Sequence, residues 1–346
     1  MSLRVGIGPV TGQVPPGSPR SVADEYADIL GLARLAEACG FDSLWVSEHH
    51  GADDGYLPSL LVVLGAVAAV TERLGLGTAV VLGPFQDPLR FAEDCAVVDQ
   101  LARGRLQVGL GAGWRHAEFG AFAIPIRERV GRTAELVRIC RAAWEGVRFS
   151  FHGTYFSYDD VAVTPAPFGR IPILLAGNVP AAAARAGRSG DGYLATPHGR
   201  IADFRRQVEV FDAAARAAGR DPERLTIGFH VNVWVLLEGT LPASVRDALW
   251  YGIGNYLRWH AEDEGATERA LPPLDETVLR ARTLIGTPAE LVAALRPWVE
   301  EFGRRDLQII ARLDHPGLGL AEIEPAVRAF GAQVIPALRR FAPVAA

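Results

Sequence analysis

The stretch LGLGTAVVLGPFQDPLRFAEDCAVVDQLARGRLQVGLGAGW, residues 74–114, contains one complete strand–helix–strand unit. An apolar run at 74–82 is followed by Asp87-Pro88, a helix start signal in which Asp caps and Pro takes the first helical position. A second apolar run at 106–110 ends in a glycine-rich turn that opens another helix. This alternation predicts parallel strands that are connected by helices.

The same alternation recurs along the whole chain. Several of the strand-like runs are apolar throughout, as expected for parallel strands that are covered on both faces. The runs begin at Arg4, Ser43, Leu74, Leu106, Ile173, Gly192, Leu225 and Asp306. Eight such units in 346 residues predict a (β/α)8 TIM barrel with insertions, and a doubly wound open sheet is the alternative.

No linker, acidic block or internal repeat divides the chain, so we predict one domain over residues 1–346. Two segments interrupt the regular alternation. Residues 149–164 indicate a small excursion of strands before the fifth barrel strand, and residues 241–284 indicate a helical insertion before the last unit.

The composition excludes several classes of protein. With 49% hydrophobic and 22% charged residues the chain is not disordered, and a pI near 5.9 with scattered arginines argues against a nucleic-acid partner. All 35 basic residues are Arg. A P-loop, a Schiff-base enzyme and a pyridoxal enzyme all need a Lys, so none of these chemistries is expected.

The sequence also bears on the compartment. The longest uncharged run, residues 55–71, is shorter than the roughly 18–20 apolar residues of a membrane span and is interrupted by Pro and Gly, which predicts a buried helix. The N-terminus lacks the basic start and apolar stretch of a signal peptide. The three cysteines are odd in number and widely spaced, so no disulfide framework is expected, and we expect a cytoplasmic protein without a membrane partner.

In barrels of this kind the active site lies at the C-terminal ends of the strands, so Ser47-Glu48-His49-His50 after the second run is a candidate. A histidine in the barrel mouth suits proton transfer near neutral pH, and Glu48 could orient it. The alternative is a histidine that closes the loop with a backbone hydrogen bond. Adjacent residues at a strand end point in opposite directions, so we do not expect His49 and His50 to share a metal, and no metal site is predicted.

Three further strand ends are candidates for binding. The turns at 109–114 (GLGAGW) and 176–180 (AGNVP) each open a helix, where free N–H groups could bind a phosphate. The first turn does not match the dinucleotide fingerprint, because Trp114 or Arg115 replaces its last glycine. Small residues along the third strand would let a flat ligand approach the backbone, and ordinary barrel packing is the alternative. No HExxH, CxxC or GxSxG motif is present.

Together these segments resemble the luciferase-like flavin-dependent monooxygenases and their deazaflavin-using relatives. The resemblance covers nearly the whole chain, and the known (β/α)8 barrel of that family agrees with the number of predicted strands. The matching segments are residues 40–50 (GFDSLWVSEHH), 74–114, 171–194 (IPILLAGNVPAAAARAGRSGDGYL), 286–295 (GTPAELVAAL) and 334–341 (VIPALRRF).

The resemblance implies a flavin that lies flat in the barrel mouth, with its phosphate on the loops after the fourth and fifth strands. The family's active-site histidine corresponds to His49, and its cis peptide bulge corresponds to Ala79-Val80. The implied cofactor-binding residues are Glu48, Ala79, Val80, Gly111, Ala112, Gly113, Ala176, Gly177 and Asn178. Candidates for substrate contact are His50, Phe85 and Trp114, with Trp250, Tyr256 and Trp259 of the helical insertion as further aromatic residues.

The chain also departs from the family. Light-emitting members carry an arginine for the flavin phosphate where this chain has Ala112, and their polar residues after the fifth strand become Gly177, Asn178 and Ala181. Phosphate binding would then rely on backbone N–H groups and a different arginine, and light emission is not expected. Deazaflavin-using sugar-phosphate dehydrogenases carry an acidic residue at Trp114, which disfavours that substrate class.

The cofactor decides the chemistry. A reduced flavin reacts with dioxygen, whereas a deazaflavin transfers hydride and reacts poorly with oxygen. The leading hypothesis is a homodimeric monooxygenase that uses reduced FMN from a separate flavin reductase to oxidise a small apolar organic substrate. The alternatives are an F420-dependent dehydrogenase or reductase and a non-catalytic flavin-binding protein.

Overall fold

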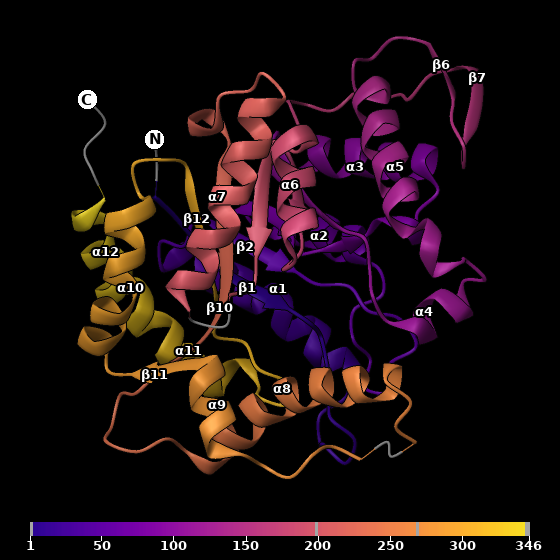
Figure 1. Ribbon diagram of the computed structural model, residues 1–346. Coiled ribbons are helices and arrows are strands. Elements are labelled where there is room, and N and C mark those ends of the chain that lie inside the picture. The colour runs from indigo at the N-terminus through magenta and orange to yellow at the C-terminus, as the bar shows by residue number, and fades with distance from the viewer. Residues whose placement is uncertain (1–2, 198–199, 268–269, 343–346) are drawn as a thin grey trace.

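Eight parallel strands close into a barrel in the computed structural model, which describes residues 3–197, 200–267 and 270–342 (Figure 1). The strands follow one another around the barrel in chain order, and β10 pairs with both β9 and β12 to close it. They are β1 (Leu3–Val10), β2 (Ser43–Val46), β3 (Gly75–Thr78), β5 (Leu106–Gly111), β8 (Ile173–Ala176), β9 (Gly192–Ala195), β10 (Thr226–Val235) and β12 (Leu307–Arg312). Each predicted run overlaps one of these strands, which confirms the (β/α)8 barrel and excludes the open sheet.

Helices surround the barrel. The capping signals that the sequence contains are present, because the Thr287 hydroxyl accepts the Glu290 N–H and the Asp87 carboxylate accepts the Leu89 N–H. The longer helices are α1 (Val22–Ala38), α2 (Leu60–Val70), α3 (Pro88–Ala102), α5 (Arg129–Ala143), α6 (Pro180–Ser189), α7 (Ile201–Ala217), α10 (Pro288–Phe302), α11 (Leu320–Ala329) and α12 (Ile335–Phe341). Short elements are β4 (Val81–Leu82), α4 (His116–Ala121), the 3-10 helices η1 (Gly83–Phe85), η2 (Ile126–Glu128) and η3 (Pro222–Arg224), and the π-helix η4 (Phe330–Val334).

The interior of the barrel is filled by side chains. Trp45 is fully buried there and donates its indole N–H to Ser43 Oγ at 2.8 Å. A Cβ atom at Gly77 would lie 2.2 Å from the Trp45 ring, so only glycine fits at that position of β3. Leu174, Leu194 and Ile310 complete this inner cluster. Inside the barrel, a ligand can therefore lie only beyond the inner cluster, toward the C-terminal mouth.

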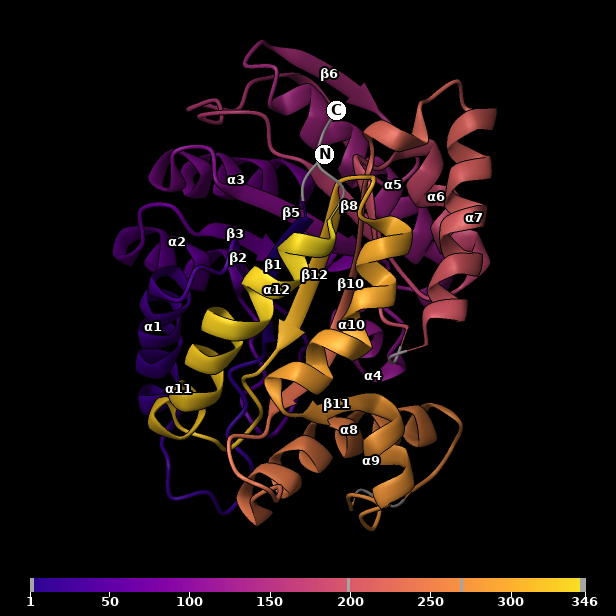
Figure 2. The ribbon, with the colours of Figure 1, turned by 90° about the vertical axis from the view of Figure 1, so that its left-hand side faces the viewer.

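Two additions depart from the barrel. Residues 149–164 contain the antiparallel pair β6 (Phe149–His152) and β7 (Ser157–Val161). The segment predicted as a helical insertion contains α8 (Ala243–Asp263) and α9 (Glu276–Arg282) and ends in β11 (Thr283–Gly286), which pairs with β10. Figure 2 shows α8 and α9 together at one end of the barrel.

Hydrogen bonds attach α8 to the loop that follows β2. The carboxylate of Asp54 accepts hydrogen bonds from Tyr251 at 2.9 Å and from Asn255 at 3.1 Å. Because this loop starts at the C-terminal end of β2, α8 lies over the mouth of the barrel. Within the described ranges, no helix combines the length and the apolar character that crossing a bilayer requires.

Candidate active site

A buried histidine and a buried carboxylate meet at the C-terminal end of β2. His49 Nδ1 lies 2.7 Å from Glu118 Oε1, and the two residues are 5% and 1% exposed. Glu118 lies on α4, directly after the β5 turn, and also accepts the backbone N–H of His50 at 2.9 Å. An ionised carboxylate can only accept a hydrogen bond, so beside ionised Glu118 the proton of His49 lies on Nδ1, and Nε2 is the nitrogen that can exchange a proton with a substrate.

Glu48 pairs with the second histidine. Its Oε1 lies 2.7 Å from His50 Nε2 and also accepts from Gln86 at 3.2 Å. Burial raises the pKa of Glu48 above its usual range, and the hydrogen bond from His50 opposes that shift. Glu48 therefore orients His50, and Glu118 takes the place beside His49 that the sequence suggested for Glu48.

Aromatic rings enclose His49. The ring of Tyr56 meets it edge-on with centroids 4.8 Å apart, and those of Trp259 and Tyr256 lie at 4.9 and 5.5 Å. Tyr256 and Trp259 belong to α8, and the Tyr56 and Tyr256 hydroxyls are 2.9 Å apart. The insertion thus supplies an apolar cover that keeps water from the histidine–carboxylate pair.

The residues expected to contact substrate fall on two sides. The ring centroid of Trp114 lies 6.3 Å from that of His49, and the Trp114 ring stacks on His260. The ring centroid of Phe85 lies instead 5.7 Å from that of His50, and the Phe85 ring stacks on Phe122. The two histidine rings thus contact different aromatic groups.

Trp250 lies in the core and donates to the Pro272 carbonyl. Among the residues that the structure describes, no three His, Cys, Asp or Glu side chains converge as a metal site would require.

Small residues form a cradle between β4 and the turns after β5 and β8. The Ala79–Val80 peptide bond is cis, as the resemblance implied. A Cβ atom at Gly111 would lie 2.7 Å from Val80 Cγ2, and Gly177 has φ +145° with no room for a Cβ beside Ala182. Val80 and Ala182 already occupy the space beside these two glycines, so no larger side chain fits there to cover the backbone of the turns, as binding of a flat ligand and its phosphate requires.

Two predicted binding residues have further neighbours. Ala112 and Ala176 line one cavity of about 170 Å³ between α5 and α6. Asn178 is exposed, and its side-chain oxygen accepts the Thr196 N–H at 2.8 Å, which links the β8 turn to the end of β9.

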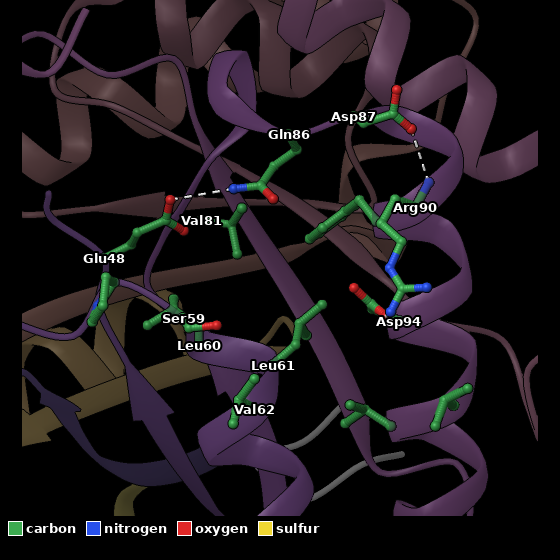
Figure 3. A pocket seen from close by; sticks show the side chains of 14 residues that line it. Glu48, Ser59, Leu60, Leu61, Val62, Val81, Gln86, Asp87, Arg90 and Asp94 are labelled. Atoms are coloured by element: carbon green, nitrogen blue, oxygen red, sulfur yellow. Dashed lines mark hydrogen bonds and ion pairs between the residues drawn. The ribbon is translucent and has the colours of Figure 1, made fainter. Parts of the chain in front are cut away.

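A second cavity, of about 280 Å³, lies between α2 and α3 and reaches Glu48 from outside the barrel. Figure 3 shows the Glu48–Gln86 hydrogen bond on one side and Asp87, Arg90 and Asp94 on the other. His49 does not line this cavity.

The profile of the luciferase-like monooxygenases matches residues 4–305. The chain belongs to this family. The resemblance in the sequence motifs is thereby confirmed over most of the chain.

Curated relatives of this luciferase-like chain include two named dehydrogenases. An F420-dependent glucose-6-phosphate dehydrogenase from Beutenbergia cavernae is 36% identical over 185 residues, which are 51% of this chain and 55% of that protein. F420-dependent glucose-6-phosphate dehydrogenase 1 from Rhodococcus jostii is 30% identical over 292 residues, 79% of this chain and 85% of that protein. The match thus spans little more than half the length of the first relative.

Solved structures share the fold of this luciferase-like chain. A monooxygenase from Streptomyces bottropensis superimposes with a TM-score of 0.80 at 28% identity, covering 96% of this chain and 99% of that one. The oxygenating constituent of 3,6-diketocamphane monooxygenase from Pseudomonas putida, in complex with FMN, gives 0.76 at 19% identity and covers 97% and 99% of the two chains. At that identity the second likeness concerns the fold alone.

Proposed function

We propose that this protein is an F420-dependent oxidoreductase that oxidises the hydroxyl-bearing carbon of a small organic substrate, with His49 as the proton acceptor. The observation that carries the proposal is the buried His49–Glu118 pair, 2.7 Å apart, at the barrel mouth. The names of the curated relatives favour F420 over reduced FMN, which reverses the order of these two cofactors in the leading hypothesis from sequence.

The residues present fit a flat ring with a phosphate. The cradle at Ala79, Val80 and Gly111 would hold the ring, and the turns that contain Ala112 and Gly177 would hold the phosphate through backbone N–H groups. Bound F420 would supply the acceptor for a hydride from the substrate carbon.

The protein's own groups manage the proton. Glu118 holds His49 with the proton on Nδ1, so that Nε2 takes the proton of the substrate hydroxyl as the carbon gives up its hydride. The substrate loses one hydride and one proton and becomes a carbonyl compound. Trp259 and Tyr256 exclude water from this exchange.

The test begins with equilibrium titration of the purified protein with F420, FMN and reduced FMN, followed by a screen of alcohols for F420 reduction. We expect F420 to bind most tightly and to be reduced without oxygen uptake. His49→Ala should lower kcat by about 10²- to 10⁴-fold while the Kd for F420 changes less than about twofold. Unchanged turnover in His49→Ala would remove the assigned role.

The likeness to the monooxygenase of Streptomyces bottropensis supports an oxygen-dependent reaction, for which reduced FMN is the second candidate cofactor. In that case a separate flavin reductase is a partner, and oxygen uptake accompanies substrate oxidation. Tight binding of reduced FMN with oxygen uptake would replace the F420 proposal. Binding of flavin with no turnover of any kind would favour a non-catalytic flavin-binding protein.

A further inference from the structure

The cavity between α5 and α6 begins at the cofactor cradle and continues outside the barrel. Its lining includes Ala112 and Ala176 at the strand ends and side chains of the two helices beyond them. One ligand could therefore touch both the turns of the mouth and the facing sides of α5 and α6.

The turns themselves offer no charge. Residues 111–113 (GAG) and 176–181 (AGNVPA) contain no basic side chain, and Val179 at the start of α6 has no side-chain oxygen to cap the helix. A phosphate on these turns would meet backbone N–H groups but no cation from the turns.

Three arginines line the same cavity, and two of them are paired. Arg138 lies 3.8 Å from Glu135, and Arg141 lies 3.4 Å from Asp191. Arg185 of α6 has no acidic partner within the described ranges, and no Asp or Glu lines the cavity.

The charges nearest Arg185 are of its own sign. Burial, together with the positive charges of Arg188 and Arg129, lowers the pKa of the Arg185 guanidinium. A half-buried cation among other cations is stabilised by an anion that enters the cavity.

We propose that Arg185 binds the phosphate group of the cofactor, a diester in F420 and a monoester in FMN, and supplies the positive charge that the turns lack. The inference rests on the proposed function, because that function brings a phosphorylated cofactor to the cradle. Arg185 reaches the ligand from α6, whereas light-emitting members place an arginine at the position of Ala112. The planar guanidinium suits phosphate because it can donate two parallel hydrogen bonds.

The experiment compares ligands with and without the phosphate. Dissociation constants are measured for F420, for the deazaflavin that lacks its phosphate side chain, for FMN and for riboflavin. They are measured with the wild type, Arg185→Ala and Arg216→Ala, which removes an exposed arginine of α7 that does not line the cavity. The ligands form two pairs: F420 with the phosphate-free deazaflavin, and FMN with riboflavin. In the pair that binds the wild type, Arg185→Ala should raise the Kd of the phosphorylated ligand by about 10- to 100-fold and that of its phosphate-free analogue by less than twofold.

Arg216→Ala should change no affinity more than twofold, and Arg185→Lys should restore part of the loss. An equal loss for both members of a pair, or no loss for either, overturns the inference. The loss with F420 identifies the diester as the ligand, and the loss with FMN identifies the monoester.

Thermal unfolding separates this inference from the proposed function. Inorganic phosphate should raise the Tm of the wild type relative to chloride at equal ionic strength, and it should not raise that of Arg185→Ala. If neither cofactor binds the wild type, the proposed function and the cofactor assignment both fail, and this shift still shows whether Arg185 binds phosphate. A phosphate-dependent shift that persists in Arg185→Ala overturns the inference.

Discussion

At the scale of single residues, the carboxylate of Glu118 decides what His49 can do. Glu118→Gln keeps a carbonyl oxygen for the Nδ1 proton but removes the negative charge that stabilises a protonated His49. We expect kcat to fall by about 10- to 100-fold while the Kd for F420 and the KM for substrate change less than about threefold. Steady-state kinetics with F420 and equilibrium titration measure these quantities.

Glu262→Gln is the matched control on the neighbouring α8. Glu262 lies 3.8 Å from Arg115, which stacks on Trp259, and it does not contact His49. This variant should keep kcat within about twofold. A loss in Glu118→Gln that appears only in the Kd for F420 would show that Glu118 supports the cofactor and not the histidine.

At the scale of elements, Glu25 of α1 packs against Asp314 in the loop after β12. Burial and the charge of Asp314 raise the pKa of Glu25 to about 8, and burial raises the pKa of Asp314 to about 6. The folded state therefore binds these protons more tightly than the unfolded chain does, and the free energy of unfolding decreases as pH rises from about 5 to about 8. The positive charge of Arg20, which lies 3.2 Å from Glu25, opposes the rise in the pKa of Glu25 and so makes the decrease in the free energy of unfolding smaller.

Glu25→Gln should remove most of the decrease between pH 6 and pH 8, because its side chain does not ionise. Urea unfolding at the two pH values gives the change in free energy for each variant. Glu37→Gln on the same helix is the control. Burial raises the pKa of Glu37, but hydrogen bonds from three backbone N–H groups outweigh it, and the net pKa is lowered. Glu37 is therefore ionised at both pH 6 and pH 8, and its contribution to the free energy of unfolding is the same at both. Glu37→Gln should keep the wild-type decrease in the free energy of unfolding. An undiminished decrease in Glu25→Gln would contradict the assignment.

At the scale of the whole molecule, exposed apolar side chains of α2 and of the second half of α3 gather on the outer face of the barrel. Val62 is 72% exposed on α2, and Val97 and Leu101 are 46% and 56% exposed on α3, beside the cavity of Figure 3. We propose that a second copy of the chain covers this face in the homodimer that the resemblance implies. Apolar surface gathered in one place is typical of an interface.

The double variant Val62→Glu/Val97→Glu should shift the protein from dimer to monomer, because burying two new charges costs more than an interface of this kind gains. Multi-angle light scattering measures the mass. Leu237→Glu, which changes an exposed leucine after β10, on the opposite side of the barrel from β3, should remain a dimer. A monomeric wild type would remove the proposal.

The sequence by itself determined the barrel and the position of the mouth. Apolar runs, caps such as Thr287-Pro288 and glycine-rich turns are local signals, because each depends on residues that are neighbours along the chain. His49 and the turns at 109–114 and 176–180 could be selected as candidates because parallel barrels place their sites at the ends of the strands.

Tertiary structure alone decided which groups meet. Glu118 is 69 residues from His49 in sequence, and its only sequence signal is its place in the first turn of the helix after the fourth barrel strand. Trp259 covers His49, and Arg185 lacks an acidic partner in the described part of the chain, because of how α8 and α6 pack on the closed barrel. Such contacts depend on distances between elements, which closure of the barrel fixes and which the local pattern of the sequence does not contain.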